Sequence, residues 1–178
     1  MKRITTRFLS MMMIMVMALG LMVMPASAAT KKVVKDQEAT VSKSVADKKA
    51  ATVKKGTYNV TVKSGQGYLK FKATQKGKYT FTFSKVKGSG DVVAFVLPMK
   101  VKKDKKSAIE MVNVSTKGGK TKTLWLAGNG GKYPDRKLIE RPLATRTATV
   151  SLKKNEMFYL YYYSGTAKST FNLVIKKK

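Results

Sequence analysis

Hydrophobic and polar residues alternate along most of the chain from residue 57 onward. Residues 68–73 and 79–84 are two such runs, in which every second residue is apolar. Alternation with a period of two is typical of a β-strand that buries one of its faces. The short segment 75–78 joins the two runs and contains a glycine, which predicts a β-hairpin.

The rest of this region predicts further short strands. Residues 91–97 are almost entirely apolar, which predicts a strand that is buried on both faces and ends at Pro98. The glycine-containing segment 117–120 predicts a second hairpin. The other alternating or apolar runs are 109–115, 121–127, 147–152, 157–163 and 171–175. Residues 57–178 therefore predict an all-β fold, an antiparallel β-sandwich or jelly roll of about eight or nine strands.

The segment before these strands, residues 29–56, has a different composition. It is rich in lysine, alanine, threonine and serine and contains no aromatic residue. Val41 and Val45 have the spacing of one helical face, but the segment has little apolar surface to bury. We predict a Lys/Ala-rich linker or a loosely docked segment, with a short helix near 36–49 as the alternative.

The first 28 residues have the three-part pattern of a secretory signal peptide. A basic start precedes an apolar run over 8–24, and small residues end at Ala28. The run is nearly long enough for a membrane anchor, but no stop-transfer pattern follows it. We predict cleavage after Ala28, a secreted mature chain of residues 29–178 and no integral membrane segment. The absence of cysteine, and hence of disulfides, favours a bacterial source with a single membrane.

Several segments share an order of glycine turns and alternating strands: 67–73 (GYLKFKA), 77–84 (GKYTFTFS), 88–91 (GSGD), 149–160 and 169–175. In this order they resemble the bacterial pre-peptidase C-terminal domain, over roughly residues 57–178. The resemblance implies a β-sandwich with a binding or accessory role, of the kind found beside secreted hydrolases. Some members of that family bind calcium through clustered carboxylates. Asp91 has no acidic neighbour in this chain, so no calcium site is carried over.

The residue types needed for most catalytic chemistry are missing. The chain contains no histidine and no cysteine, which excludes Ser-His-Asp and Cys-His catalysis and the usual zinc ligands. Its 9 acidic residues are scattered singly, whereas calcium needs several converging carboxylates. A glycosidase needs one carboxylate pair, and Glu110, Glu140 and Glu156 are the candidates, each more simply explained as a surface charge. We predict no enzyme activity, no catalytic residues, no metal site and no cofactor.

One tyrosine-rich run is a candidate for sugar binding. In an alternating strand, Tyr162 joins the core while Tyr159, Tyr161 and Tyr163 share the opposite face. Three tyrosines on one face, with Trp125 as a further candidate, would stack on sugar rings. The alternative, which we favour, is that they cover the second face of a central strand.

The strong positive charge is the other candidate feature. The chain has a formal charge of +28. Removing Lys2, Arg3 and Arg7 with the signal leaves 34 of the 37 basic residues and all 9 acidic ones, a charge of +25. This exceeds the magnitude of about 2–8 that solubility needs. Nearly all of these cations are lysines, which act as hydrated point charges rather than planar recognition groups.

The charge predicts attraction to anionic polymers. Outside a bacterial cell these are wall and lipid-linked teichoic acids, anionic lipids and acidic polysaccharides, and the attraction weakens with salt. Specific nucleic-acid binding is not predicted, because the chain is exported. The alternative is that the lysines reflect composition and solubility alone. The candidate binding residues are Lys70, Lys72, Lys102, Lys103, Lys105, Lys106, Lys153 and Lys154.

We therefore predict a secreted, non-enzymatic binding or accessory domain that is associated with the cell wall through its lysines. A carbohydrate-binding module that uses the tyrosines and Trp125, or an accessory domain to a secreted hydrolase, is the alternative. The sequence does not specify an oligomeric state.

Overall fold

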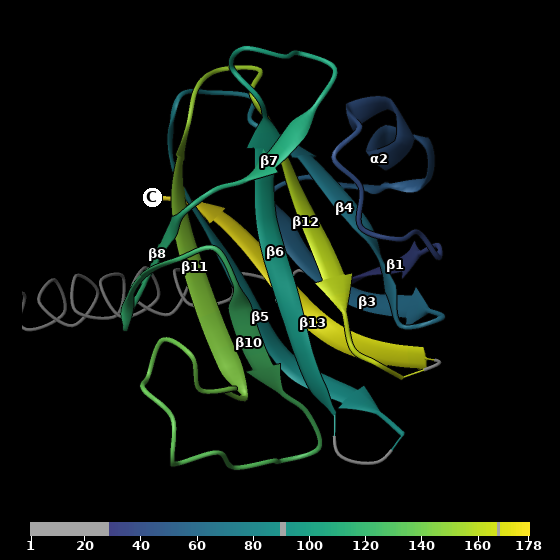
Figure 1. Ribbon diagram of the computed structural model, residues 1–178, viewed down its shortest axis with the longest axis vertical. Helices are drawn as coiled ribbons and strands as arrows, with labels where there is room; N and C mark the ends of the chain where they lie inside the picture. Colours follow the sequence, from purple (N-terminus) through teal and green to yellow (C-terminus); the bar gives the residue numbers. More distant parts are fainter. Residues whose placement is uncertain (1–28, 90–91, 167) are drawn as a thin grey trace, which may run out of the picture.

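The computed structural model describes residues 29–89, 92–166 and 168–178, which form two β-sheets packed face to face (Figure 1). The strands of the larger sheet are β1 (Thr30–Val34), β3 (Gly56–Lys63), β5 (Gly77–Gly88), β8 (Val114–Thr116), β9 (Gly119–Thr121), β11 (Thr145–Leu152) and β13 (Lys168–Lys177). The order in this seven-stranded sheet is β1-β3-β13-β5-β11-β8-β9.

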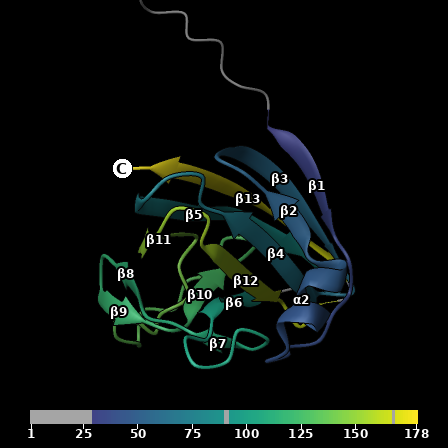
Figure 2. The same cartoon turned by 90° about the horizontal axis from the view of Figure 1, so that it is seen from above.

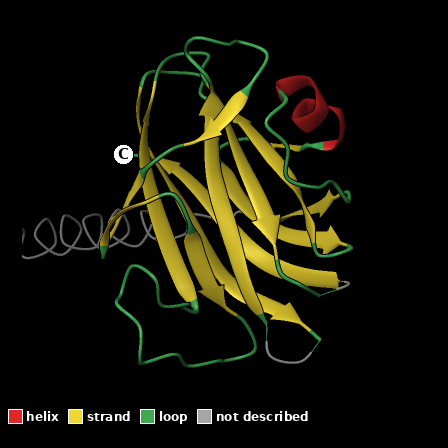
Figure 3. Ribbon diagram, in the orientation of Figure 1, coloured by secondary structure: helices red, strands yellow, loops and turns green. Residues whose placement is uncertain are grey.

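The second sheet has six strands. They are β2 (Ala51–Val53), β4 (Gln66–Lys72), β6 (Val93–Val101), β7 (Ile109–Met111), β10 (Leu124–Ala127) and β12 (Met157–Tyr163). The order is β10-β6-β12-β4-β2, and β7 pairs with β6. The short helix α2 (Lys43–Lys49) lies outside this sheet, next to β4 (Figures 2 and 3). The predicted all-β sandwich is confirmed.

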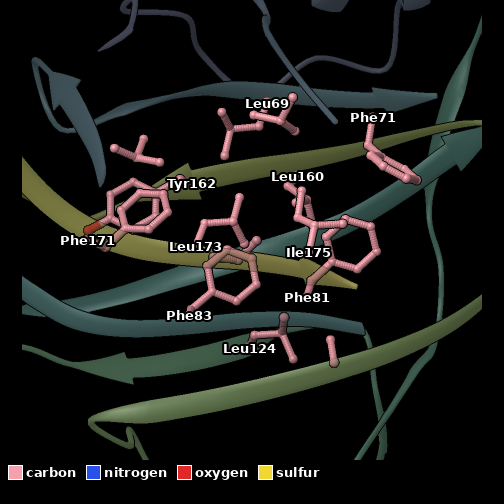
Figure 4. Packing of buried hydrophobic residues seen from close by; sticks show 14 of the residues in the cluster. Leu69, Phe71, Phe81, Phe83, Leu124, Leu160, Tyr162, Phe171, Leu173 and Ile175 are labelled. Carbon is pink, nitrogen blue, oxygen red and sulfur yellow. The ribbon is translucent and has the colours of Figure 1, made fainter. Parts of the chain in front are cut away.

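The inner faces of the two sheets form the main core, as the alternation of the strands requires. Phe71 of the six-stranded sheet meets Phe81 of the seven-stranded sheet edge to face, with ring centroids 5.4 Å apart. Tyr162 stacks on Phe171 across the same layer, with centroids 4.6 Å apart (Figure 4). These side chains are almost completely buried. The residues that alternate with them point away from the core and form the two outer faces.

The predicted hairpin over 68–84 is wrong. Its two strands are β4 and β5, and they belong to different sheets. Alternation shows which side chains face the core but not which strand lies alongside, so two runs with equally apolar faces fit either arrangement. Here the apolar faces meet across the core, and the intervening turn crosses from one sheet to the other. The second predicted hairpin, at 117–120, is confirmed at its turn, which joins β8 and β9. The outer parts of its two predicted strands are β7 and β10, which pair with β6 in the other sheet.

The sandwich also has more strands than the eight or nine predicted, and its sheets are mixed rather than antiparallel. Two pairs are parallel, β1 with β3 and β2 with β4. Both involve residues 29–56, so the structure differs from the predicted flexible linker and contains the alternative helix. Strand pairing uses backbone groups and needs few large side chains, which is why composition alone pointed to a linker.

The N-terminal strand also fits closely against the second sheet. Gly67 lies in β4 with a φ of +155°, and a Cβ at this position would stand 2.4 Å from the backbone carbonyl oxygen of Lys35. Only glycine therefore lets the chain after β1 approach β4 this closely.

Strand β6 continues through Pro98 instead of ending there as predicted. The Pro98 carbonyl accepts a hydrogen bond of 2.9 Å from the Val112 amide, so the Pro98 nitrogen points to the same edge of the strand. Along that edge β10 pairs with residues 93–96 and β7 with residues 99–101. Pro98 falls in the gap between them, where no amide hydrogen is needed.

The predicted signal peptide and its cleavage site lie outside the described residues. Among the helical residues from position 29 onward, no segment is long and apolar enough to cross a membrane.

Candidate functional site

The outer face of the six-stranded sheet is aromatic, and part of it is covered. Residues 36–50, which we call the covering segment, run across it and include α2 (Figure 2). Tyr159 is 0% exposed and Tyr161 is 4% exposed beneath or beside this cover. They form a second cluster with Tyr68, Met99 and other residues, including Ala46 of α2. The prediction that Tyr159 and Tyr161 share one face is confirmed, and their burial leaves no ring face open for a sugar.

Hydrogen bonds fix the covering segment to the tyrosines. The Tyr68 hydroxyl accepts a 2.9 Å bond from the Thr40 amide and donates a 3.0 Å bond to the Thr40 carbonyl. The Tyr159 hydroxyl donates to Asp47 Oδ1 at 3.1 Å. Burial raises the pKa of Tyr68 and Tyr159, and it raises the pKa of Tyr161 to about 12. These hydroxyls therefore stay protonated at neutral pH.

Asp47 is the charged anchor of the covering segment. Lys43 Nζ lies 2.6 Å from Asp47 Oδ2, and Lys70 Nζ lies 3.7 Å from Asp47 Oδ1. Burial raises the pKa of Asp47, but the hydrogen bonds from Lys43 and Tyr159 and the two lysine charges outweigh it, so the pKa lies below its ordinary value. Lys70, a predicted polyanion-binding residue, therefore pairs with Asp47 within the protein.

The remaining two candidates for sugar stacking, Tyr163 and Trp125, lie on the uncovered part of the same face. Phe95 stands between them in register. Its ring stacks on Tyr163 at 5.1 Å and 26°, and meets Trp125 at 5.5 Å and 64°. Phe95 therefore stacks on one face of Tyr163 and meets Trp125 edge to face. The three rings pack against one another and do not form the flat, open platform that a sugar ring would need. Tyr163 is still 39% exposed, so this row is an apolar surface patch.

Most of the predicted lysines gather at one end of the sandwich, the upper end in Figure 1, where β6 and β11 end and β12 begins. Lysines from distant parts of the chain meet here because, in an antiparallel pair, the end of one strand lies beside the start of its partner. We call this region the basic end. Its lysines are Lys72, Lys76, Lys78, Lys100, Lys102, Lys103, Lys105, Lys106, Lys153, Lys154, Lys176, Lys177 and Lys178.

A depression lies at the centre of the basic end. It consists of two adjoining hollows of about 590 and 580 Å³ that share Lys78, Lys100, Val112 and Ser151. Four exposed lysines complete its walls: Lys76, Lys103, Lys153 and Lys178. We call this the basic depression.

Tight turns hold the lysines of the basic depression in place. Asn155 takes a left-handed conformation, with φ +65°, between β11 and β12, which asparagine tolerates better than most residues. Its amide donates to the Ala73 carbonyl at 2.7 Å, and Glu156 Oε2 accepts from the Lys153 amide at 2.6 Å. Lys153 and Lys154 therefore project from a turn that is fixed on both sides.

The carboxylates near the depression are partly engaged already. Glu156 Oε1 forms a 2.9 Å ion pair with Lys100, so this carboxylate closes the turn rather than standing free. Glu110 also lines the depression, and Glu140 lies in the loop between β10 and β11. Within residues 29–89, 92–166 and 168–178, no three side chains of His, Cys, Asp or Glu gather as metal ligands would.

An apolar groove of about 820 Å³ adjoins the basic depression, and the two share Glu110. Its apolar lining consists of Ala39, Val41, Leu97, Met99, Ala108, Ile109 and Met111. Lys102 and Lys105, both predicted as binding residues, stand on its rim. The Lys102 amide bonds the Ala108 carbonyl at 2.9 Å, which folds residues 102–108 into a short loop over one end of the groove.

Sequence reasoning missed both hollows and several of their residues. Lys76, Lys78, Lys100 and Lys178 were not predicted because they are far from one another in sequence and meet only through strand pairing. The groove was missed because one wall comes from residues 39–41 of the expected linker. The signal that existed was Val41, an apolar residue in a lysine-rich segment.

Comparisons with known proteins add no family. No protein-family model matches the chain, and no curated protein matches it. One similar solved structure is CorA, a surface-associated copper-binding protein of Methylomicrobium album BG8, at 8% identity and a TM-score of 0.44, covering 72% of this chain and 98% of that one. Another is PliG of Aeromonas hydrophila, a periplasmic inhibitor of g-type lysozyme, at 11% identity and a TM-score of 0.28, covering 84% and 100%. Both TM-scores lie below 0.5, so neither similarity carries an argument about function.

Proposed function

We propose that this protein is a non-enzymatic binding protein of the bacterial cell surface, and that the basic end attaches it to anionic polymers of the cell wall. The observation that carries the proposal is the convergence of lysines around one depression: they come from β5, from β6 and from the segments that follow β4, β6, β11 and β13. Lysines that serve only to keep the protein in solution need not converge, because charge spread over the whole surface gives the same solubility.

The geometry suits a flexible polyanion. Lysine ammonium groups are hydrated point charges on long stems, so they follow a chain of phosphates or carboxylates without demanding one planar geometry. Within the described chain, Glu110, Glu156 and Asp104 are the carboxylates of this end, and two of them pair with lysines. The field at the depression therefore stays positive.

The predicted secretion and the resemblance to the pre-peptidase C-terminal domain support the same function. An exported chain meets wall polymers rather than intracellular nucleic acid. The resemblance implies a module without catalysis, and it stays a prediction because no family model matches.

The test compares two triple variants of equal charge in co-sedimentation with purified cell wall. The first carries Lys78→Gln, Lys103→Gln and Lys153→Gln in the basic depression. The control carries Lys63→Gln, Lys87→Gln and Lys168→Gln, which are exposed lysines at the opposite end of the sandwich. At roughly 1 kcal/mol per lysine near an anionic surface, the first set weakens binding about a hundredfold and the control much less.

A salt series completes this test. Binding of the wild-type chain falls steeply as the salt concentration rises, because exposed charges are screened. Equal losses in the two triple variants would show that only net charge matters. Binding that is absent at low salt, or that does not change with salt, would contradict the proposed function.

A further inference from the structure

The apolar groove is an unusual surface for a chain of this charge. Val41 is 71% exposed and Met111 is 46% exposed, although both are large apolar side chains. The groove continues onto Leu97 and Met99 of β6, so the apolar surface is contiguous rather than scattered. Contiguous exposed apolar surface in a water-soluble fold marks a binding site more often than isolated side chains do. Its volume of about 820 Å³ lies in the range of small-ligand sites.

The surroundings of the groove restrict what can occupy it. Lys102 and Lys105 stand on its rim, and Lys103 lines the adjoining basic depression. Lys102 pairs with Asp104 at 3.5 Å, but the Asp104 side chain is 73% exposed, and such exposed pairs are weak. An occupant must therefore present an apolar part to the groove and negative charge to its rim. A second copy of this chain does not fit, because two mature chains of +25 repel each other.

We propose that the groove binds the alkyl chain of an anionic amphiphile, one molecule at a time, while the rim lysines and the basic depression hold its phosphate-bearing head. This rests on the proposed function, because the head would be the lipid-linked end of the anionic polymer. The protein then recognises where such a polymer joins its lipid, and not only the repeating charge.

The side chains of the groove suit a flexible chain. Met99 and Met111 are unbranched and polarisable, and methionine adapts to apolar ligands of varied shape. The floor is firm, because Met99 and Ile109 belong to the buried outer cluster with Tyr68, Tyr159 and Tyr161. The Ile109 amide bonds the Val41 carbonyl at 2.7 Å, which fixes the two walls relative to each other.

The test uses residues 29–178, which contain both sheets and their core, and the probe is dodecyl phosphate below its micelle-forming concentration. Isothermal titration calorimetry at several temperatures compares it with methyl phosphate, which has the same head without the chain. The proposal expects binding of dodecyl phosphate at least about tenfold tighter, since each buried methylene adds to the affinity, and a negative heat-capacity change. Equal affinities for the two phosphates would overturn it.

Variants locate the site. Val41→Asn with Met111→Gln keeps the net charge and removes apolar surface that is already exposed, so folding is little affected. It should weaken dodecyl phosphate about tenfold or more, while Val33→Asn, an exposed valine on β1 outside the groove, should not. Unchanged affinity in the groove variant would overturn the proposal.

Two further experiments separate this proposal from binding to a membrane surface and from the proposed function. Anionic phosphatidylglycerol vesicles test a membrane surface: groove-dependent vesicle binding without binding of monomeric dodecyl phosphate would overturn single-molecule uptake. Co-sedimentation with cell wall tests the proposed function. The groove variant should sediment with wall polymer as the wild type does, and the basic-depression triple variant should bind it about a hundredfold more weakly. Groove-dependent binding of dodecyl phosphate with no wall binding would support the groove and refute the proposed function.

Discussion

The outer face of the seven-stranded sheet carries Thr80 and Asn172, whereas the outer face of the six-stranded sheet carries Tyr68, Tyr159 and Phe95. The polar face needs no cover, and the strands of the seven-stranded sheet leave it open to solvent. The aromatic face is covered over part of its area by the covering segment, and the rest is open as the apolar groove and the Phe95 row. The six-stranded sheet therefore has an outer face that needs a partner, and the chain itself supplies one for part of it.

The largest expected effect comes from removing an aromatic side chain of the covered face. Tyr68→Ala empties a fully buried site and leaves Thr40 without its two hydrogen bonds. It should lower the free energy of unfolding by about 3–5 kcal/mol, as for other buried aromatic residues replaced by alanine. Thr80→Ala on the polar face should change it by less than about 0.5 kcal/mol. Urea denaturation measures both, and equal effects would remove the distinction between the faces.

A smaller effect is expected at the anchor of the covering segment. Asp47→Asn loses its ion pairs with Lys43 and Lys70 and should cost about 1–2 kcal/mol of unfolding free energy at neutral pH. The control is Asp104→Asn, whose carboxylate is exposed and weakly paired, and it should have almost no effect.

The contribution of Asp47 should also depend on pH. Its pKa is lower in the folded chain than in the unfolded chain. The stabilisation is therefore present above the ordinary carboxyl pKa of about 4 and disappears as the pH falls through the lowered value. Wild type and Asp47→Asn should converge in stability in acid, and a difference that persists at the lowest pH would contradict the assigned ion pairs.

The smallest expected effect concerns Tyr161, at the margin between the covered and open parts. Its hydroxyl donates to Gln66 Oε1 at 2.8 Å, and Tyr161→Phe should cost less than about 1 kcal/mol at neutral pH. Because burial raises its pKa to about 12, stability from this group is present below the ordinary tyrosine pKa of about 10 and is lost as the pH rises to about 12. Tyrosinate absorbance should lose a step near pH 12 in the variant; loss of a step near pH 10 instead would place Tyr161 in solvent.

Alternation predicted the two faces of β12 but not what lies over them. Tyr162 is in the core, and Tyr159, Tyr161 and Tyr163 share the other face, as the period of two requires. The burial of Tyr159 depends on residues 36–50, which contain no aromatic residue and pack through hydrogen bonds and Ala46. Local composition has no signal for such a cover, because the apolar surface that it needs is supplied by the sheet.

The sequence predicted that lysines form the candidate site, but it did not predict which lysines lie together in the folded chain. Lys102, Lys103, Lys153 and Lys154 stood out as runs in the sequence, and they lie at the basic end. Lys100 and Lys178 were not singled out, because only the order of strands shows that they line one depression. Strand order is a long-range property, and the wrong hairpin over 68–84 shows that it does not follow from local pattern.

The position of β13 has a consequence for how the chain folds. Residues 168–177 insert between β3 and β5, near the middle of the seven-stranded sheet. During synthesis, β3 and β5 therefore have no common partner until these late residues have been made, and the sheet stays in two separate pieces. Folds that depend on such distant pairings form slowly. The seven-stranded sheet therefore cannot close into one piece before residues 168–177 take their place between β3 and β5.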